Sequence, residues 1–130
     1  MQKFTFLLYL SLVFSLVSCS NELVHTWNID NYEIIRENGK ESSYRNIGTL
    51  TFDKEGTGHF NYQIIENDFI DKSKFTWEKK EGYILIKPAS NSSESKLTKA
   101  WIITEDKAKK QIWKSTDGDY KIQILELSRN

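Results

Sequence analysis

Short apolar runs with a period of two, separated by turn-forming residues, constrain this chain more than any other feature of its sequence. The alternation is plainest at Phe60–Ile64, Phe75–Trp77 and Tyr120–Ile124, where aromatic or β-branched side chains alternate with polar ones. A strand that is buried on one face requires this pattern. Between the runs, Asn38-Gly39 and Asp117-Gly118 supply residues that tolerate the positive φ angles of tight hairpins. The alternation predicts an all-β fold, and no stretch after residue 23 keeps a helical period.

The apolar runs predict eight strands, most of them joined by links short enough for hairpins. The strands are expected at residues 24–36, 46–52, 57–65, 73–78, 82–87, 97–104, 108–115 and 119–128. Eight consecutive antiparallel strands are typical of an up-and-down barrel, which closes on itself and leaves no exposed sheet edge. A β-sandwich of similar size would have the same pattern, so both architectures are open at this point.

The first 18 residues have the composition of an export signal. Lys3 precedes a mostly apolar stretch from Phe4 to Val17, and small residues follow it. A membrane-spanning helix needs about 20 apolar residues, so this shorter stretch fits the hydrophobic region of a signal peptide. The residues Leu16-Val17-Ser18-Cys19 resemble the lipobox of bacterial lipoproteins. The alternative is an ordinary secretory signal with a chance cysteine near its end.

The resemblance to bacterial lipoproteins implies that the signal, residues 1–18, is removed and that Cys19 carries a diacylglyceryl group. Cys19 is the only cysteine, so no disulfide can form within the chain. Two or three acyl chains hold a protein at a membrane, whereas one binds reversibly. Ser20 after the cysteine resembles cargo sorted to the bacterial outer membrane. We therefore expect a lipidated tether at residues 19–24, a domain at residues 25–130, and either the periplasmic or the outer face as its location.

Charge and composition limit the partners of this domain. Without the signal the chain has 112 residues and a net charge of −1. Nucleic-acid-binding domains need a basic face, so a neutral domain argues against a nucleic-acid partner. Thirteen aromatic residues remain after the signal is removed, which is enough for one core. We expect one domain, monomeric, whose contact with the membrane is the lipid on Cys19.

Several segments together resemble the small bacterial lipocalin-like domain over residues 23–129. His25-Thr26-Trp27 resembles the Gly-x-Trp signature, with histidine in the glycine position, and residues 48–58 and 75–85 are similar to two hairpins of that family. Residues 124–129 resemble its last strand, which ends on a basic residue. The resemblance implies that Trp27 plugs the closed end of a barrel and that Arg129 stacks across its indole ring, both in structural roles.

The barrel interior is the expected place for a ligand. Barrels of eight strands are either filled by side chains or hold one small ligand, and such pockets are mostly apolar. Six aromatic residues are the candidates for lining a pocket: Phe60, Tyr62, Phe75, Trp77, Tyr83 and Trp101. The same residues would serve equally as ordinary core.

Catalytic and metal chemistry has little support in the sequence. The two histidines, His25 and His59, lie far apart in the sequence, and the chain has no second cysteine that could act as a further metal ligand. No metal site or cofactor is therefore expected. Asp117-Gly118-Asp119 is explained by a hairpin turn rather than by calcium. No nucleophile motif or phosphate-binding loop occurs. An enzyme would have to use carboxylates paired across strands, which one sequence does not reveal.

Two functions follow from these observations. The first is a lipid-anchored, non-catalytic barrel that binds a small apolar or amphipathic ligand in its open mouth. The second is an envelope interaction module, in which a filled barrel presents the loops Glu66–Lys72 and Ser90–Lys96 to a protein or glycan partner. An exposed apolar patch around Phe69-Ile70 would favour the second function.

Overall fold

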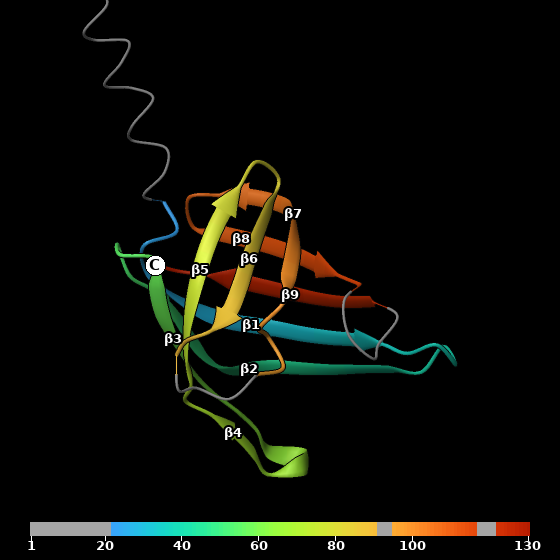
Figure 1. The fold of residues 1–130 in the computed structure, drawn as a ribbon. Coiled ribbons are helices and arrows are strands. Elements are labelled where there is room, and N and C mark those ends of the chain that lie inside the picture. The colour runs from blue at the N-terminus through green and yellow to red at the C-terminus, as the bar shows by residue number, and fades with distance from the viewer. Residues whose placement is uncertain (1–21, 91–94, 117–121) are drawn as a thin grey trace, which may run out of the picture.

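The computed structural model describes residues 22–90, 95–116 and 122–130, which form nine β-strands and a short 3-10 helix (Figure 1). The strands are β1 (Thr26–Ile35), β2 (Glu41–Phe52), β3 (Thr57–Ile64), β4 (Phe69–Asp71), β5 (Lys74–Lys80), β6 (Tyr83–Pro88), β7 (Ala100–Lys107), β8 (Lys110–Ser115) and β9 (Ile122–Ser128). The helix η2 (Ile65–Asn67) lies between β3 and β4. The predicted signal, Cys19, residues 91–94 of the Ser90–Lys96 loop and the turn at Asp117-Gly118 lie outside the described residues.

Eight of these strands close a ring. Each pairs antiparallel with the next in the order β1, β2, β3, β5, β6, β7, β8 and β9, and β9 pairs back onto β1. The short β4 pairs only with β3, beyond the end of β5. The predicted up-and-down barrel is therefore confirmed, and the sandwich alternative is excluded.

Two regions of the fold differ from the strands predicted from the sequence. β2 begins at Glu41 rather than at residue 46, because the turn at Asn38-Gly39 starts a longer hairpin in which Arg36 N donates to Lys40 O at 2.9 Å. This hairpin of β1 and β2 extends beyond the rest of the barrel (Figure 1). The predicted loop Glu66–Lys72 contains the end of η2 and the extra strand β4.

The barrel interior is filled by aromatic side chains. The ring of Phe52 lies edge-on to Phe75, Trp77 and Trp113, with centroids 5.4, 5.2 and 6.0 Å away, and the centroids of Phe60 and Phe75 are 4.6 Å apart. Edge-to-face aromatic contacts add to the free energy gained by burying the rings. These side chains, except the half-buried Trp77, belong to one cluster of buried residues that runs from Leu23 to Leu127. The segment 20–130 therefore contains this whole core and all of the strands.

One end of the barrel is closed by Trp27. The hairpins β2–β3, β5–β6 and β7–β8 and both ends of the described chain lie at this end. Trp27 is fully buried, its Nε1 donates to Leu23 O at 3.0 Å, and the guanidinium carbon of Arg129 lies 5.6 Å from its ring centroid. This is the geometry of a cation–π contact, between the two residues that the lipocalin-like resemblance paired.

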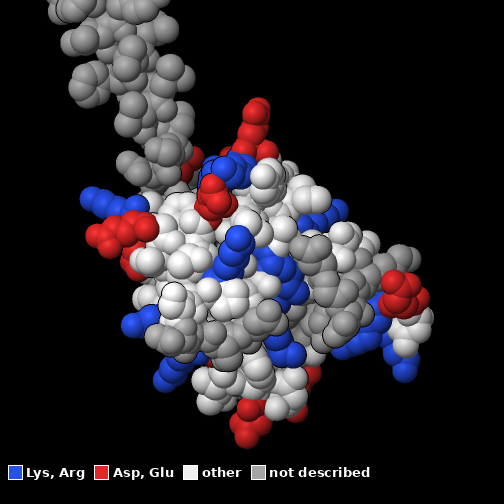
Figure 2. Space-filling model, in the orientation of Figure 1, with Lys and Arg blue, Asp and Glu red and all other residues white. Residues whose placement is uncertain are grey.

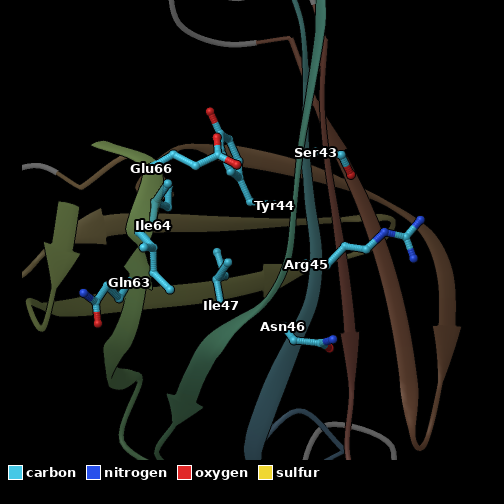
Figure 3. A pocket seen from close by; sticks show the side chains of 9 residues that line it. Ser43, Tyr44, Arg45, Asn46, Ile47, Gln63, Ile64 and Glu66 are labelled. Carbon is cyan, nitrogen blue, oxygen red and sulfur yellow. The ribbon is translucent and has the colours of Figure 1, made fainter. Parts of the chain in front are cut away.

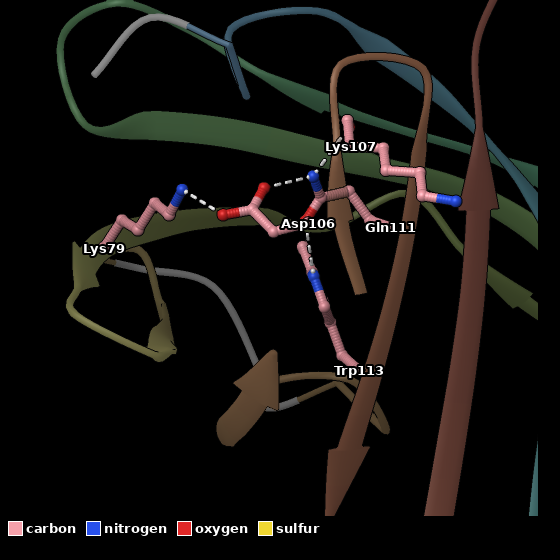
Figure 4. A network of polar contacts seen from close by, with 5 residues as sticks. All are labelled: Lys79, Asp106, Lys107, Gln111 and Trp113. Carbon is pink, nitrogen blue, oxygen red and sulfur yellow. Dashed lines mark hydrogen bonds and ion pairs between the residues drawn. The ribbon is translucent and has the colours of Figure 1, made fainter. Parts of the chain in front are cut away.

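A polar network also lies at the closed end (Figure 4). The buried Gln111 donates to Asp106 Oδ1 at 2.6 Å and accepts from Trp113 Nε1 at 3.1 Å, while Lys79 Nζ lies 3.0 Å from Asp106 Oδ2. Partial burial alone would raise the pKa of Asp106, but the hydrogen bonds from Gln111 and Lys79 outweigh it and lower the pKa below its usual value. The network ties β5 to the β7–β8 hairpin and satisfies the indole of a core tryptophan.

Gly48 offers a direct test of this architecture. It adopts φ +148°, and a Cβ there would overlap the backbone oxygen of Asn61 and lie 2.6 Å from Tyr62 Cα, on the paired strand. Gly48→Ala is therefore expected to lower the free energy of unfolding by about 3 kcal/mol, the upper range for forced overpacking. The measurement is chemical denaturation of residues 20–130. Gly39→Ala is the control, because Gly39 also has positive φ (+83°) but no atoms near its Cβ; equal losses in both variants would contradict the close β2–β3 contact.

Candidate functional site

The wall of the barrel opens where β2 separates from β3. The two strands pair only from Gly48↔Tyr62 to Phe52↔Gly58. Beyond this point β2 continues beside β1 alone, and β3 continues beside β4 on its other edge. Asn46, with φ +52°, lies in an irregularity of the β1–β2 register next to Gly48, and such bulges bend a strand. The bend leaves a gap at the rim of the barrel.

The gap forms a solvent-open hollow of about 380 Å³, here named the rim cleft. Its walls are the β2 segment Ser43–Ile47 and the segment Gln63–Glu66 at the end of β3. In Figure 3, Ile47 and Ile64 point toward one another across the cleft, whereas Arg45 points away from it. The cleft thus has an apolar centre and polar borders, which suits a small amphipathic group.

A second hollow of about 300 Å³ adjoins the rim cleft. It is lined by Ile47, Asn61, Tyr62, Gln63, Ile70 and Lys72, so Ile47 and Gln63 border both hollows. The two hollows and the strand β4 therefore form one continuous surface beside the mouth.

Exposed apolar side chains project from the same surface. Ile65 is 83% exposed and Ile70 is 57% exposed, and Phe69 between them is half-buried against the core. We call Ile65, Phe69 and Ile70 the mouth patch. Exposed apolar side chains that lie together mark interaction sites more often than isolated ones do. Ile65 belongs to η2, Phe69 and Ile70 belong to β4, and this segment projects away from the barrel (Figure 1).

Asp71 joins the two longest loops of the mouth. Its buried carboxylate accepts hydrogen bonds from Ser73 N at 2.9 Å, from Ser73 Oγ at 2.6 Å and from Ser95 Oγ. Lys96 adds a second contact, with Nζ 4.9 Å from the ring centroid of Phe69. The described ends of the predicted partner-binding loops are therefore held together on one side of the mouth.

Tyr62 lies beneath this connection and stays protonated. Its hydroxyl is 3.4 Å from Ser95 Oγ, and burial raises the pKa of the hydroxyl above its ordinary value. Ser95 has the Asp71 carboxylate but no histidine as a hydrogen-bond partner, and His59 is exposed on β3. Within the described ranges, no three His, Cys, Asp or Glu side chains lie close enough together to hold a metal ion.

The six aromatic residues predicted to line a ligand pocket do not share one surface. Phe60, Tyr62, Phe75 and Trp101 are at most 2% exposed and belong to the core. Trp77 is half-buried and its Nε1 donates to Thr57 O at 2.9 Å, while Tyr83 is 42% exposed beside Ile102 on the outside of the barrel. Of the six, only Tyr62 borders a hollow described above. A ligand role for these residues stays a prediction.

The surface carries charges of both signs. On the face seen in Figure 2, lysine and arginine lie both over the middle and at the borders, whereas aspartate and glutamate lie mostly toward the borders. No helix in the described part of the chain is long and apolar enough to cross a bilayer.

A solved structure has the same fold. A lipocalin-like protein from Bacteroides uniformis superposes with a TM-score of 0.58 at 9% sequence identity, over 83% of this chain and 99% of that one. The chain has a lipocalin-like fold. No protein-family model matches the sequence, and no curated protein matches it. At this identity the likeness concerns the lipocalin-like barrel alone.

Removing the Asp71 carboxylate should loosen the mouth. Asp71→Ala leaves Ser73 N–H and both serine hydroxyls without their acceptor, so we expect a loss of about 1–3 kcal/mol in the free energy of unfolding. Hydrogen exchange of residues 69–71 should accelerate more than that of β8. Glu66→Ala is the control, because Glu66 is exposed and none of the ion pairs within the described residues involves it. Unchanged exchange in β4 would show that Asp71 does not hold the loops.

Proposed function

We propose that this protein is a lipid-anchored, non-catalytic lipoprotein of the bacterial envelope that binds a partner protein at the mouth of its barrel. The observation that carries the proposal is the contrast between the filled interior of the barrel and the exposed apolar side chains on its outer surface. Aromatic side chains fill the interior, whereas Ile65 and Ile70 are exposed beside the mouth. A filled barrel acts as a rigid scaffold, and the function then depends on its surface.

Anchoring through Cys19 would orient the mouth of the barrel relative to the membrane. Four residue steps separate Cys19 from Leu23, so the tether spans at most about 14 Å when fully extended. Leu23 is buried at the closed end, where it accepts the hydrogen bond from the Trp27 indole. A lipid on Cys19 therefore holds the closed end near the membrane, and leaves the mouth patch on the far side where a partner can reach it.

The chemistry of the mouth patch favours a protein over a glycan. Ile65 and Ile70 present branched aliphatic side chains, and the core of a protein interface is apolar with few charges. The connection through Asp71 and Ser95 holds the described ends of the neighbouring loops together before a partner arrives, which reduces the entropy that those ends lose on binding.

The rim cleft favours a second candidate function, the binding of a small amphipathic ligand. Its volume of about 380 Å³ falls within the size range of ligand pockets, and Ile47 and Ile64 give it an apolar centre. Such a ligand would lie between β2 and β3 rather than on the barrel axis.

The anchor is tested by replacing its thiol. In the native bacterium, the wild-type chain should incorporate labelled fatty acid and partition into detergent, because acylation at Cys19 supplies at least two chains. Cys19→Ser removes the thiol that is acylated and should abolish both properties. Ser20→Cys in the Cys19→Ser background is the matched control for position. Detergent partitioning of Cys19→Ser equal to wild type would contradict lipidation.

The partner-binding surface is tested by photo-cross-linking in intact cells. A photoreactive residue at Ile70 should give a discrete cross-linked product, because this side chain is 57% exposed in the mouth patch. The same residue at Lys54, in the hairpin at the closed end, is the control. The product should also disappear when Ile65→Ser is added. Equal labelling at both positions, or none at Ile70, would refute binding at the mouth.

A further inference from the structure

The outer half of β2 has an unpaired edge. From Glu41 to Arg45 the strand pairs with β1, and its pairing with β3 begins only at Gly48. No other described strand pairs with this segment. Its side-chain contacts go to the β1 side: Ser43 Oγ donates to Asn31 Oδ1 at 2.7 Å, Arg36 donates to Ser42 Oγ at 2.7 Å, and the ring centroid of Tyr44 lies 6.3 Å from that of Tyr32. An open edge presents a row of backbone N–H and C=O groups to another strand. Closed barrels normally have no such edge, so this one calls for an explanation.

Backbone geometry determines which residues face the open edge. In an antiparallel pair, residues alternate between bonding the neighbour and pointing away from it. Arg36 N donates to Lys40 O, so the alternation directs the backbone groups of Ser42 and Tyr44 toward β1. The backbone groups of Glu41, Ser43 and Arg45 are then directed toward the open edge.

The side chains on this edge form a self-complementary pattern. Glu41, Ser43 and Arg45 are all exposed, and within the described ranges no ion pair involves Glu41 or Arg45. The acid and the base are placed symmetrically, two residues on either side of Ser43. A strand that is antiparallel to β2 and centred on Ser43 would complement it by carrying an acid opposite Arg45 and a base opposite Glu41. β2 of a second copy has this sequence.

We propose that the β2 edge, Glu41–Arg45, pairs antiparallel with the same edge of a second copy of this chain, about a two-fold axis at Ser43. Glu41 then lies opposite Arg45 of the second copy, and the symmetry repeats the pair. Directly opposed charges of unlike sign stabilise antiparallel strands, and like charges destabilise them. An interface of this kind is isologous, so it closes at two copies and does not grow into a fibre.

The same register brings the hairpin tip of each copy to the rim cleft of the other. With Ser43 opposite Ser43, Lys40 of the second copy lies opposite Asn46, at the border of the cleft that also holds Glu66. The tip is small because it consists of Asn38 and Gly39, and nothing lies within 4 Å of the Cβ position of Gly39. A second copy therefore fills both the open edge and the cleft. This pairing differs from the monomer expected from the sequence, and it leaves Ile70 free.

The pairing is tested by sedimentation equilibrium of residues 20–130. The protein concentration is raised to about 1 mM, because a short edge contact is weak. We expect a reversible dimer. Glu41→Arg alone or Arg45→Glu alone places like charges opposite each other at two symmetric positions, and should weaken dimerisation at least about tenfold. The double variant Glu41→Arg/Arg45→Glu restores unlike pairs and should recover the wild-type dissociation constant. A species that stays monomeric, or a dimer indifferent to both single changes, would overturn the proposal.

A cysteine probe tests the register independently. The segment 20–130 contains no cysteine, and two opposed Ser43 residues have a Cα separation of about 5.5 Å, which a disulfide can bridge. Ser43→Cys should therefore form a covalent dimer on mild oxidation. Lys40→Cys is the matched control, because two copies of that position lie about 20 Å apart in the same register. Equal cross-linking of both variants would rule out this register. Neither result affects the cross-linking expected at Ile70, so the two proposals fail separately.

Discussion

Closure of the strand ring around an aromatic interior is the constraint on which the rest of the structure depends. β9 pairs with β1 from Asn28↔Ser128 to Ile35↔Ile122, so the pairing of the last strand with the first closes the barrel. The ring then encloses side chains such as Phe60, Phe75 and Trp113, which are at most 1% exposed. A small eight-stranded barrel is either filled or holds a ligand. Because this one is filled by its own aromatic residues, the binding that we propose involves its surface.

The features that suit recognition all lie where β2 leaves β3. The backbone conformations of Asn46 and Gly48 bend β2 away, which opens the rim cleft and frees the edge of the strand. On the other wall of the cleft, η2 carries the exposed Ile65, and β4 carries the exposed Ile70 beside the adjoining hollow. One local irregularity in a closed barrel thus opens a hollow and an edge, and the apolar side chains of η2 and β4 lie beside them. Ile70 and the β2 edge are separate surfaces, whereas Ile65 of the mouth patch also lines the rim cleft that a second copy would fill.

The period-two alternation was enough to predict the all-β class and eight strands, because in a half-buried strand the alternate apolar residues are the ones that face the core. It did not predict the outer half of β2, where Glu41–Arg45 is mostly polar and depends on pairing with β1. The outward direction of Tyr83 was also hidden, because Tyr83-Ile84-Leu85-Ile86 is apolar on both faces. The contact of Asp71 with Ser95 joins residues 24 positions apart, and only the folded chain brings them together. The bulge at Asn46, which creates the cleft, has no local signal in the sequence.

The most direct test of a filled interior is a titration of isotope-labelled residues 20–130 with lauric acid, an amphipathic probe, followed by two-dimensional NMR. The indole N–H groups of Trp101 and Trp113 report on the interior, because both rings are fully buried and bonded to Leu97 O and Gln111 Oε1. The account predicts that these two signals stay unchanged, and that any response is confined to amides of the rim cleft such as Ile47 and Ile64. Saturable shifts of both indole signals would place the ligand inside the barrel and contradict the account.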